Sequence, residues 1–164
     1  MAFRAAVESP VGPLWVEGDE HIHRLGWGDT ESHGDSPLAA ECMAQLAAYF
    51  AGTRREFDLP LAPAGSDFQQ RVFREMSAIG FGETRTYGEL ATALGSAAQP
   101  IGQACGANPI PIIIPCHRVV AADGGRSRVR ELLSVPAQEA PTGHHALATV
   151  VRTERGHAGT CLQR

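Results

Sequence analysis

The chain contains no lysine, because all 14 of its basic residues are arginine. Arginine suits bidentate phosphate contacts, but we attribute the bias to a GC-rich genome, which would produce it in any protein. The first residues lack a basic stretch followed by an apolar one, and no apolar run is long enough to cross a membrane. These absences exclude a secretory signal and a membrane span, so we expect a soluble cytoplasmic protein.

Closely spaced cysteine pairs are also absent. The cysteines stand far apart in the sequence, at Cys42, Cys105, Cys116 and Cys161. Without a CxxC pair, we expect reduced thiols and neither a disulfide framework nor a compact zinc site. Three histidines fall in a low-complexity tail, where such residues are usually solvated, so we assign no metal to His144, His145 and His157.

Positive charge is scarce, with a formal net charge of -4, and unevenly distributed. Residues 1–65 carry four arginines against ten acidic residues, whereas residues 66–130 carry seven against five. Residues 131–164 carry three arginines and three acidic residues. Because phosphate contacts require local positive charge, the middle third is the only candidate nucleic-acid surface.

The first half of the chain predicts a small antiparallel sheet followed by one helix. Apolar segments separated by turn signals indicate strands at Phe3–Val7, 14–16 and Ile22–Trp27. Apolar residues at helical spacing indicate a helix over 37–52. Residues 53–65 are rich in arginine, proline and glycine and show no period, so we place a domain boundary there and assign 1–65 to the first domain.

The second half predicts three helices. Ser66 and Gln69 have capping-box spacing and open a helix that we expect to end at Gly80. Thr86 and Glu89 repeat that spacing before a helix over 87–94, and a second short helix over 98–106 completes a helix-turn-helix arrangement. The residues of this last helix are mostly small, which favours close approach to a minor groove if it binds DNA. A helix pair packed together without DNA fits the periodicity equally well.

Residues 108–120 carry the strongest chemical signal. Three prolines predict a stiff extended segment that ends at Cys116. A cysteine thiolate is a nucleophile when a base or positive charge lies nearby, and His117 and Arg118 follow directly. Since neighbours in extended chain point to opposite faces, His117 would reach Cys116 across a bend or through water. The alternative is that Cys116 is a buried structural residue.

The run PIPIIIPCHRVV, the preceding GANP and the upstream GFGETRTYGELATALG closely resemble the O6-alkylguanine-DNA alkyltransferases, also called methylated-DNA–protein-cysteine methyltransferases. The likeness is strong over residues 66–123 and looser in the first half, through SPVGPL and AAYFAG; SDFQQRVF also carries it. It implies an α+β fold. A ribonuclease-H-like half of small antiparallel sheet plus helix would precede a mostly helical, winged-helix-like domain over 66–125.

The resemblance implies irreversible transfer of an alkyl group from O6-alkylguanine, or O4-alkylthymine, in duplex DNA to Cys116. Each molecule would act once and without a cofactor. His117 would be the base that helps form the thiolate through a bound water, and Tyr87 would crowd the target phosphate and donate a proton to the departing guanine. Asn108 would brace the turn before the active-site segment, and the other cysteines would be structural.

The implied partner is double-stranded DNA, bound through the minor groove by a monomer that flips the damaged nucleotide out of the stack. The expected contacts with DNA come from Tyr87, Gln99, Gly102, Gln103, Ala104 and Arg118. Gln99 stands where the family usually has an arginine that fills the gap left by the flipped base, so we expect reduced DNA affinity. Arg118 belongs to the motif, and we also expect it to have a structural role.

Residues 126–164 form a divergent tail. The family continues there with a glycine-rich loop that lines the guanine pocket, which this sequence lacks. The candidate glutamates, Glu131 and Glu139, are not at the family spacing, and we take Glu139 as the partner for His117. We hypothesise that the tail is read out of frame, or is truncated and extended; coding DNA without an alternative frame for the missing loop would contradict this. Such a tail could leave the protein inactive.

Three other functions are alternatives to DNA repair. A non-enzymatic damage sensor of the alkyltransferase-like type would bind the lesion, although that group usually lacks the acceptor cysteine. A helix-turn-helix transcription factor would show sequence-selective duplex binding. A cysteine hydrolase would turn over a small ester or amide, but a histidine adjacent to the nucleophile in extended chain pairs poorly with it.

Overall fold

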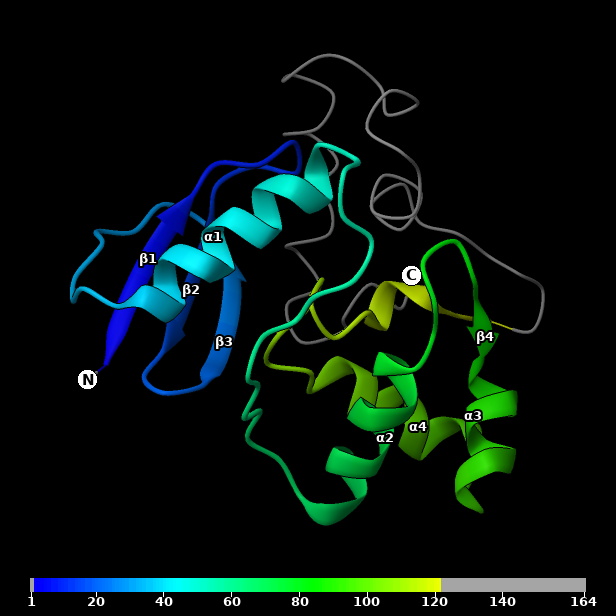
Figure 1. Cartoon of the computed structure of the whole chain (residues 1–164). Helices are drawn as coiled ribbons and strands as arrows, with labels where there is room; N and C mark the ends of the chain where they lie inside the picture. The colour runs from blue at the N-terminus through cyan, green and yellow to red at the C-terminus, as the bar shows by residue number, and fades with distance from the viewer. Residues whose placement is uncertain (1, 122–164) are drawn as a thin grey trace.

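The computed structural model describes residues 2–121, which begin with a three-stranded antiparallel sheet (Figure 1). The strands β1 (Phe3–Val7), β2 (Leu14–Gly18) and β3 (Ile22–Trp27) pair in sequence order. Apolar side chains on one face are buried, among them Phe3, Leu14, Val16, Ile22 and Leu25. All three predicted strands are confirmed, and β2 extends two residues beyond the predicted end because its pairing with β1 continues to Gly18.

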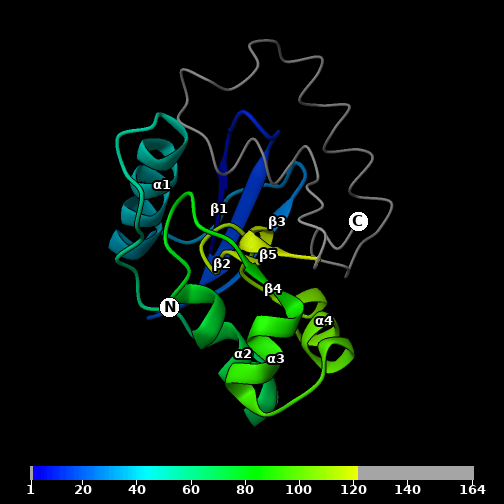
Figure 2. The same ribbon diagram turned by 90° about the vertical axis from the view of Figure 1, so that its right-hand side faces the viewer.

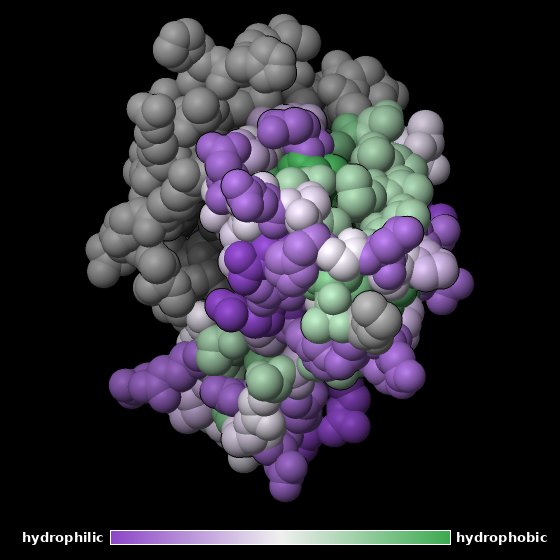
Figure 3. All heavy atoms as spheres, turned by 90° about the vertical axis from the view of Figure 1, so that its left-hand side faces the viewer, coloured by the Kyte–Doolittle hydropathy of each residue, from purple (hydrophilic) through white to green (hydrophobic). Residues whose placement is uncertain are grey.

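Helix α1 (Pro37–Phe50) packs against the buried face of this sheet (Figures 1 and 2). Ser36 caps it by accepting a hydrogen bond from the Leu38 amide, and a proline occupies the first helical position. Cys42, Leu46 and Tyr49 recur at helical spacing and are buried. The exposed side of α1 carries small apolar residues, and hydrophobic surface gathers along it at the right of Figure 3.

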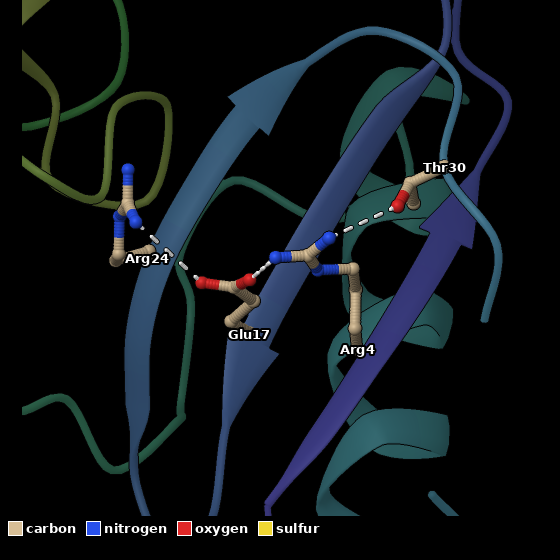
Figure 4. A network of polar contacts seen from close by, with 4 residues as sticks. All are labelled: Arg4, Glu17, Arg24 and Thr30. Carbon is tan, nitrogen blue, oxygen red and sulfur yellow. Dashed lines mark hydrogen bonds and ion pairs between the residues drawn. The ribbon is translucent and has the colours of Figure 1, made fainter. Parts of the chain in front are cut away.

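The opposite face of the sheet is polar (Figure 4). Glu17 on β2 pairs with Arg4 of β1 and lies 3.8 Å from Arg24 of β3, and Arg4 also donates to the Thr30 hydroxyl. The guanidinium groups of both arginines lie 5.4 Å from the Trp15 ring centroid. These cross-strand contacts stabilise the face that solvent reaches.

The second half begins with α2 (Asp67–Ser77), whose Ser66 and Gln69 form the predicted capping box. The predicted end at Gly80 is wrong. The helix stops at Ser77 because the Ile79 amide donates to the Met76 carbonyl in a tighter turn that buries the Ile79 side chain.

A helix-turn-helix follows. After the short strand β4 (Arg85–Thr86), helix α3 (Tyr87–Leu94) is capped by Thr86 and ends at Gly95, whose φ of 63° suits glycine. Helix α4 (Ala98–Gly106) packs against α3 and α2. Both helices have the bounds that the sequence predicts.

The two halves share one hydrophobic core. The chain then forms a single 3-10 turn, η1 (Cys116–Arg118), and strand β5 (Val119–Val120), which lie between the sheet half and the helices in both ribbon views (Figures 1 and 2). The Leu25 amide of β3 donates to the Pro109 carbonyl at 2.9 Å, which ties the sheet to the segment before η1. Along residues 2–121, no helix combines the length and apolar character that a membrane crossing requires. Expectations for Glu139, Cys161, the three tail histidines and the divergent tail fall outside the described residues.

Candidate functional site

The segment before Cys116 makes a tight turn, so the predicted extended conformation is wrong. The Ile114 amide donates to the Ile110 carbonyl at 2.9 Å, and Pro111 and Ile114 form an isolated bridge. Ile112 has a φ of 74°. Proline restricts its own φ and the residue before it, but it does not prevent the following residue from turning.

Asn108 closes this turn from inside the protein. Its Nδ2 donates to the Ile114 carbonyl at 2.9 Å, and its Oδ1 accepts from the Ile110 amide at 3.0 Å. Because its side chain satisfies one group on each side of the turn, Asn108 fixes the path of the chain toward Cys116.

Cys116 and His117 lie side by side in the 3-10 turn. The Cys116 amide donates to the Ile114 carbonyl at 2.8 Å, and the Arg118 amide donates to the Pro115 carbonyl at 3.0 Å. Successive side chains in such a turn are about 120° apart, rather than on opposite faces as in a strand. Our expectation for extended chain is therefore corrected. Cys116 is 1% exposed and His117 is 0% exposed, so both are shielded from bulk water.

Arg118 is also internal. It is 6% exposed, and its Nη1 donates to the Ile79 carbonyl at 2.6 Å. This placement agrees with the structural role that we expected. A guanidinium held in the interior does not face a DNA phosphate, so we remove Arg118 from the expected DNA contacts.

Tyr87 is brought to the site by a strand pairing of two residues. β4 and β5 run parallel, with Arg85 opposite Val119 and Thr86 opposite Val120. Tyr87 follows β4 at the first position of α3, and its side chain is half-buried. The pairing thus places the start of the helix-turn-helix beside the segment that carries Cys116 and His117.

The expected DNA-contacting residues of α4 divide between two faces. Gln99 and Gln103 are exposed and Gly102 is half-buried; their spacing puts all three on one helix face. Ala104 is 2% exposed and belongs to the core. Its side chain points away from this face, so our expectation that Ala104 contacts DNA is corrected.

The remaining described cysteines are poor nucleophiles. Burial raises the pKa of the Cys42 thiol and of the Cys105 thiol to about 12, so both stay protonated at neutral pH. Cys105 Sγ lies 3.5 Å from Met76 Sδ inside the helical half. No cluster of three or more histidine, cysteine, aspartate or glutamate side chains suited to a metal ion occurs within residues 2–121.

Sequence reasoning missed the residues that surround the Arg118 side chain. Phe81 stacks with the guanidinium, Ile79 accepts its hydrogen bond, and Tyr49 of α1 lies close by. Tyr49 and Phe81 stand in two stretches that carry the family resemblance, AAYFAG and GFGETRTYG. That resemblance was the signal that could have pointed to them. Nothing in their spacing showed that they meet.

Family models match both halves of the chain. Residues 3–63 match the 6-O-methylguanine DNA methyltransferase, ribonuclease-like domain. Residues 67–140 match the 6-O-methylguanine DNA methyltransferase, DNA binding domain.

Relatives align over most of their length. The methylated-DNA--protein-cysteine methyltransferase of Mycobacterium tuberculosis is 40% identical over 152 residues, which covers 82% of this chain and 92% of the relative. The constitutive enzyme of that name from Bacillus subtilis is 39% identical over 134 residues, with 73% and 81% covered. A crystal structure of Mycobacterium tuberculosis OGT in complex with DNA superposes with a TM-score of 0.74 at 39% identity, covering 88% of this chain and 98% of that one.

Proposed function

Because the chain belongs to the 6-O-methylguanine DNA methyltransferase family, we propose that it repairs DNA by taking the alkyl group of O6-alkylguanine onto Cys116. The observation that carries the assignment to this residue is the placement of Cys116 and His117 in one buried turn beside the start of the helix-turn-helix. The same chemistry would extend to O4-alkylthymine.

The proposed reaction is a displacement at the alkyl carbon. The Cys116 thiolate forms the new S–C bond, the C–O6 bond breaks, and its electron pair remains on the guanine, which takes up one proton. His117 serves as the base that removes the thiol proton, through a water, and Tyr87 supplies the proton to the departing guanine. A thioether has no good leaving group, so each molecule acts once and needs no cofactor.

The damaged base has to leave the duplex to reach the buried residue Cys116. We propose that Gln99, Gly102 and Gln103 face the minor groove, because the side of α4 that they share is exposed or half-buried. Small residues permit close approach of the helix to a narrow groove. Gln99 fills the gap left by the flipped nucleotide without contributing charge. Asn108 supports the site by holding the turn before Cys116.

We also propose that the protein acts as a monomer in the cytoplasm. A division near residue 65 separates the sheet half from the domain that carries the DNA contacts and the acceptor. The limits of the two family models, 3–63 and 67–140, support this division.

The test is intact-protein mass after incubation with a duplex containing one O6-methylguanine, in a buffer that keeps thiols reduced. We expect a single methyl increment that peptide mapping assigns to Cys116. Cys116→Ala and an unmodified duplex are the controls, and both should leave the mass unchanged. If the protein binds the lesion but gains no methyl mass, the alternative function of a non-enzymatic damage sensor is supported. A methyl group on another residue would contradict the assignment to Cys116.

A further inference from the structure

The Arg118 guanidinium is enclosed by groups from two segments far away in the sequence. From the connection between α2 and β4, the Ile79 carbonyl accepts its hydrogen bond at 2.6 Å, and the Phe81 ring centroid lies 5.7 Å from its Cζ. From α1, the Tyr49 ring meets the Phe81 ring edge-on at 6.0 Å and 81°. Burial raises the pKa of Tyr49, and the nearby Arg118 charge opposes the rise, which agrees with close approach of the two side chains.

These neutral groups hold a buried positive charge. Among residues 2–121, no aspartate or glutamate forms an ion pair with Arg118. A buried charge without a counter-ion is costly, so the Ile79 carbonyl, the Phe81 ring face and the neighbouring Tyr49 side chain compensate for its lost hydration. Phe81 also stacks with Arg55, whose Cζ lies 5.2 Å from the ring centroid, and this second contact helps to hold the ring in place.

Arg118 is close in the chain to the proposed alkyl acceptor, Cys116. Arg118 follows His117 in the three-residue turn, and its amide closes that turn on the Pro115 carbonyl. The contacts that anchor the Arg118 side chain therefore help to fix the backbone that sets the directions of Cys116 and His117. Misplacement of reacting groups by about 1 Å can slow a reaction about 100-fold.

We propose that Tyr49 and Phe81 are positioning residues, which hold the Cys116–Arg118 turn in its reactive geometry by packing around Arg118. The inference rests on the proposed function of Cys116. It gives the sheet half of the molecule a part in alkyl transfer, because Tyr49 belongs to α1.

The first experiment measures single-turnover methyl transfer at increasing concentrations of O6-methylguanine duplex. Phe81→Leu removes the ring face and keeps apolar bulk, so we expect the maximal rate constant to fall roughly 3- to 10-fold. The half-saturating duplex concentration should stay within about twofold, since Phe81 and Arg118 are not among the proposed DNA contacts. Tyr49→Leu should act in the same direction. Phe81→Tyr keeps the ring and should restore the rate.

Phe50→Leu is the matched control. Phe50 contacts Tyr49 edge-on at 5.6 Å, so this variant also loses an aromatic contact of the cluster, but without removing a ring from Arg118. Its rate constant should equal that of the wild type. An unchanged rate in Phe81→Leu, an equal loss in Phe50→Leu, or a change confined to the half-saturating concentration would overturn the proposal.

Backbone hydrogen exchange of the same full-length variants separates this proposal from the proposed function. Peptides covering 115–120 should exchange several-fold faster in Phe81→Leu and Tyr49→Leu than in the wild type, Phe81→Tyr or Phe50→Leu. If the wild type transfers no methyl group, the function proposed for Cys116 fails, and exchange alone decides whether the aromatic residues hold the turn. Wild-type exchange in both variants would then overturn the positioning role.

Discussion

At the scale of single residues, Ile112 and Asn108 determine how the chain reaches Cys116. Ile112 is 1% exposed and has a φ of 74°, a conformation that a β-branched residue adopts at a cost of about 1–2 kcal/mol. The two hydrogen bonds of Asn108 hold the turn closed around it. Backbone strain of this kind persists only where surrounding contacts enforce it.

Replacement of Asn108 should therefore damage both stability and transfer. Asn108→Asp keeps an acceptor for the Ile110 amide but sets a second oxygen against the Ile114 carbonyl, which then lacks its donor. We expect a loss of about 1–3 kcal/mol in the free energy of unfolding, measured in urea. The exposed Gln103→Ala should change it by less than about 0.5 kcal/mol. Equal stability of Asn108→Asp and the wild type would show that the amide does not brace the turn.

His23 should make stability depend on pH. Its ring nitrogens face the Ala62 carbonyl at 3.1 Å and the Asp19 carboxylate at 2.8 Å, and because both groups only accept, the protonated ring satisfies both. The Ala62 carbonyl and the Asp19 carboxylate raise the pKa of His23 above 6.5, and hydrogen bonds from His21 and His23 lower that of Asp19 below 3.8.

The stabilisation is complete below pH 6.5, as long as Asp19 stays ionised, and is lost as the pH rises through the raised pKa of folded His23. His23→Gln should thus lower the melting temperature relative to wild type more at pH 5.5 than at pH 9. The His23 and Asp19 side chains are 41% and 47% exposed, so solvent screens the pair and a small difference is expected. If the melting temperatures of the wild type and His23→Gln differ by the same amount at pH 5.5 and at pH 9, the stabilising role assigned to protonated His23 is contradicted.

At the scale of elements, α2 and α3 begin with the same kind of N-terminal cap but lie at different distances from the proposed site. Ser66 accepts from the Gln69 amide at 3.2 Å at the start of α2, and Thr86 accepts from the Glu89 amide at 3.0 Å at the start of α3. Only the second cap is adjacent to a proposed site residue, Tyr87.

Loss of either cap should cost similar stability and have unequal effects on transfer. Ser66→Ala and Thr86→Ala should each lower the free energy of unfolding by about 1 kcal/mol. At a temperature where both remain folded, we expect slower methyl transfer in Thr86→Ala alone, since fraying of the first turn of α3 displaces Tyr87. Thr86→Ser should retain the wild-type rate. Equal transfer rates in the two alanine variants would contradict a role for the start of α3.

At the scale of the whole molecule, the sheet half and the helical half bury their apolar side chains in one cluster. The Cys116–Arg118 turn lies between them, and its surroundings come from both. A site built in this way requires the halves to be folded together.

The shared core predicts cooperative unfolding. Both tryptophans of the chain, Trp15 and Trp27, lie on strands of the sheet, whereas three of the four described α-helices lie in the other half. Tryptophan fluorescence and far-UV circular dichroism therefore sample different halves, and their urea midpoints should coincide. Separate midpoints would show that the halves unfold independently.

The sequence by itself determined the elements whose signals are local. The three strands of the sheet, the caps at Ser66 and Thr86, and the bounds of α3 and α4 are each decided by neighbouring residues, and all were predicted. The motif around Cys116 also identified the family, because its characteristic residues are consecutive in the sequence.

Only the tertiary structure decided how distant residues share one interior. The turn at Ile112 closes because the side chain of Asn108 bonds across it, and β4 meets β5 through a pairing of only two residues, which is too short to show a period. Ala104 faces the core and Arg118 is enclosed by Phe81 for the same reason. A side chain's surroundings depend on which segments pack together, and burial free energy summed over the whole core selects that packing.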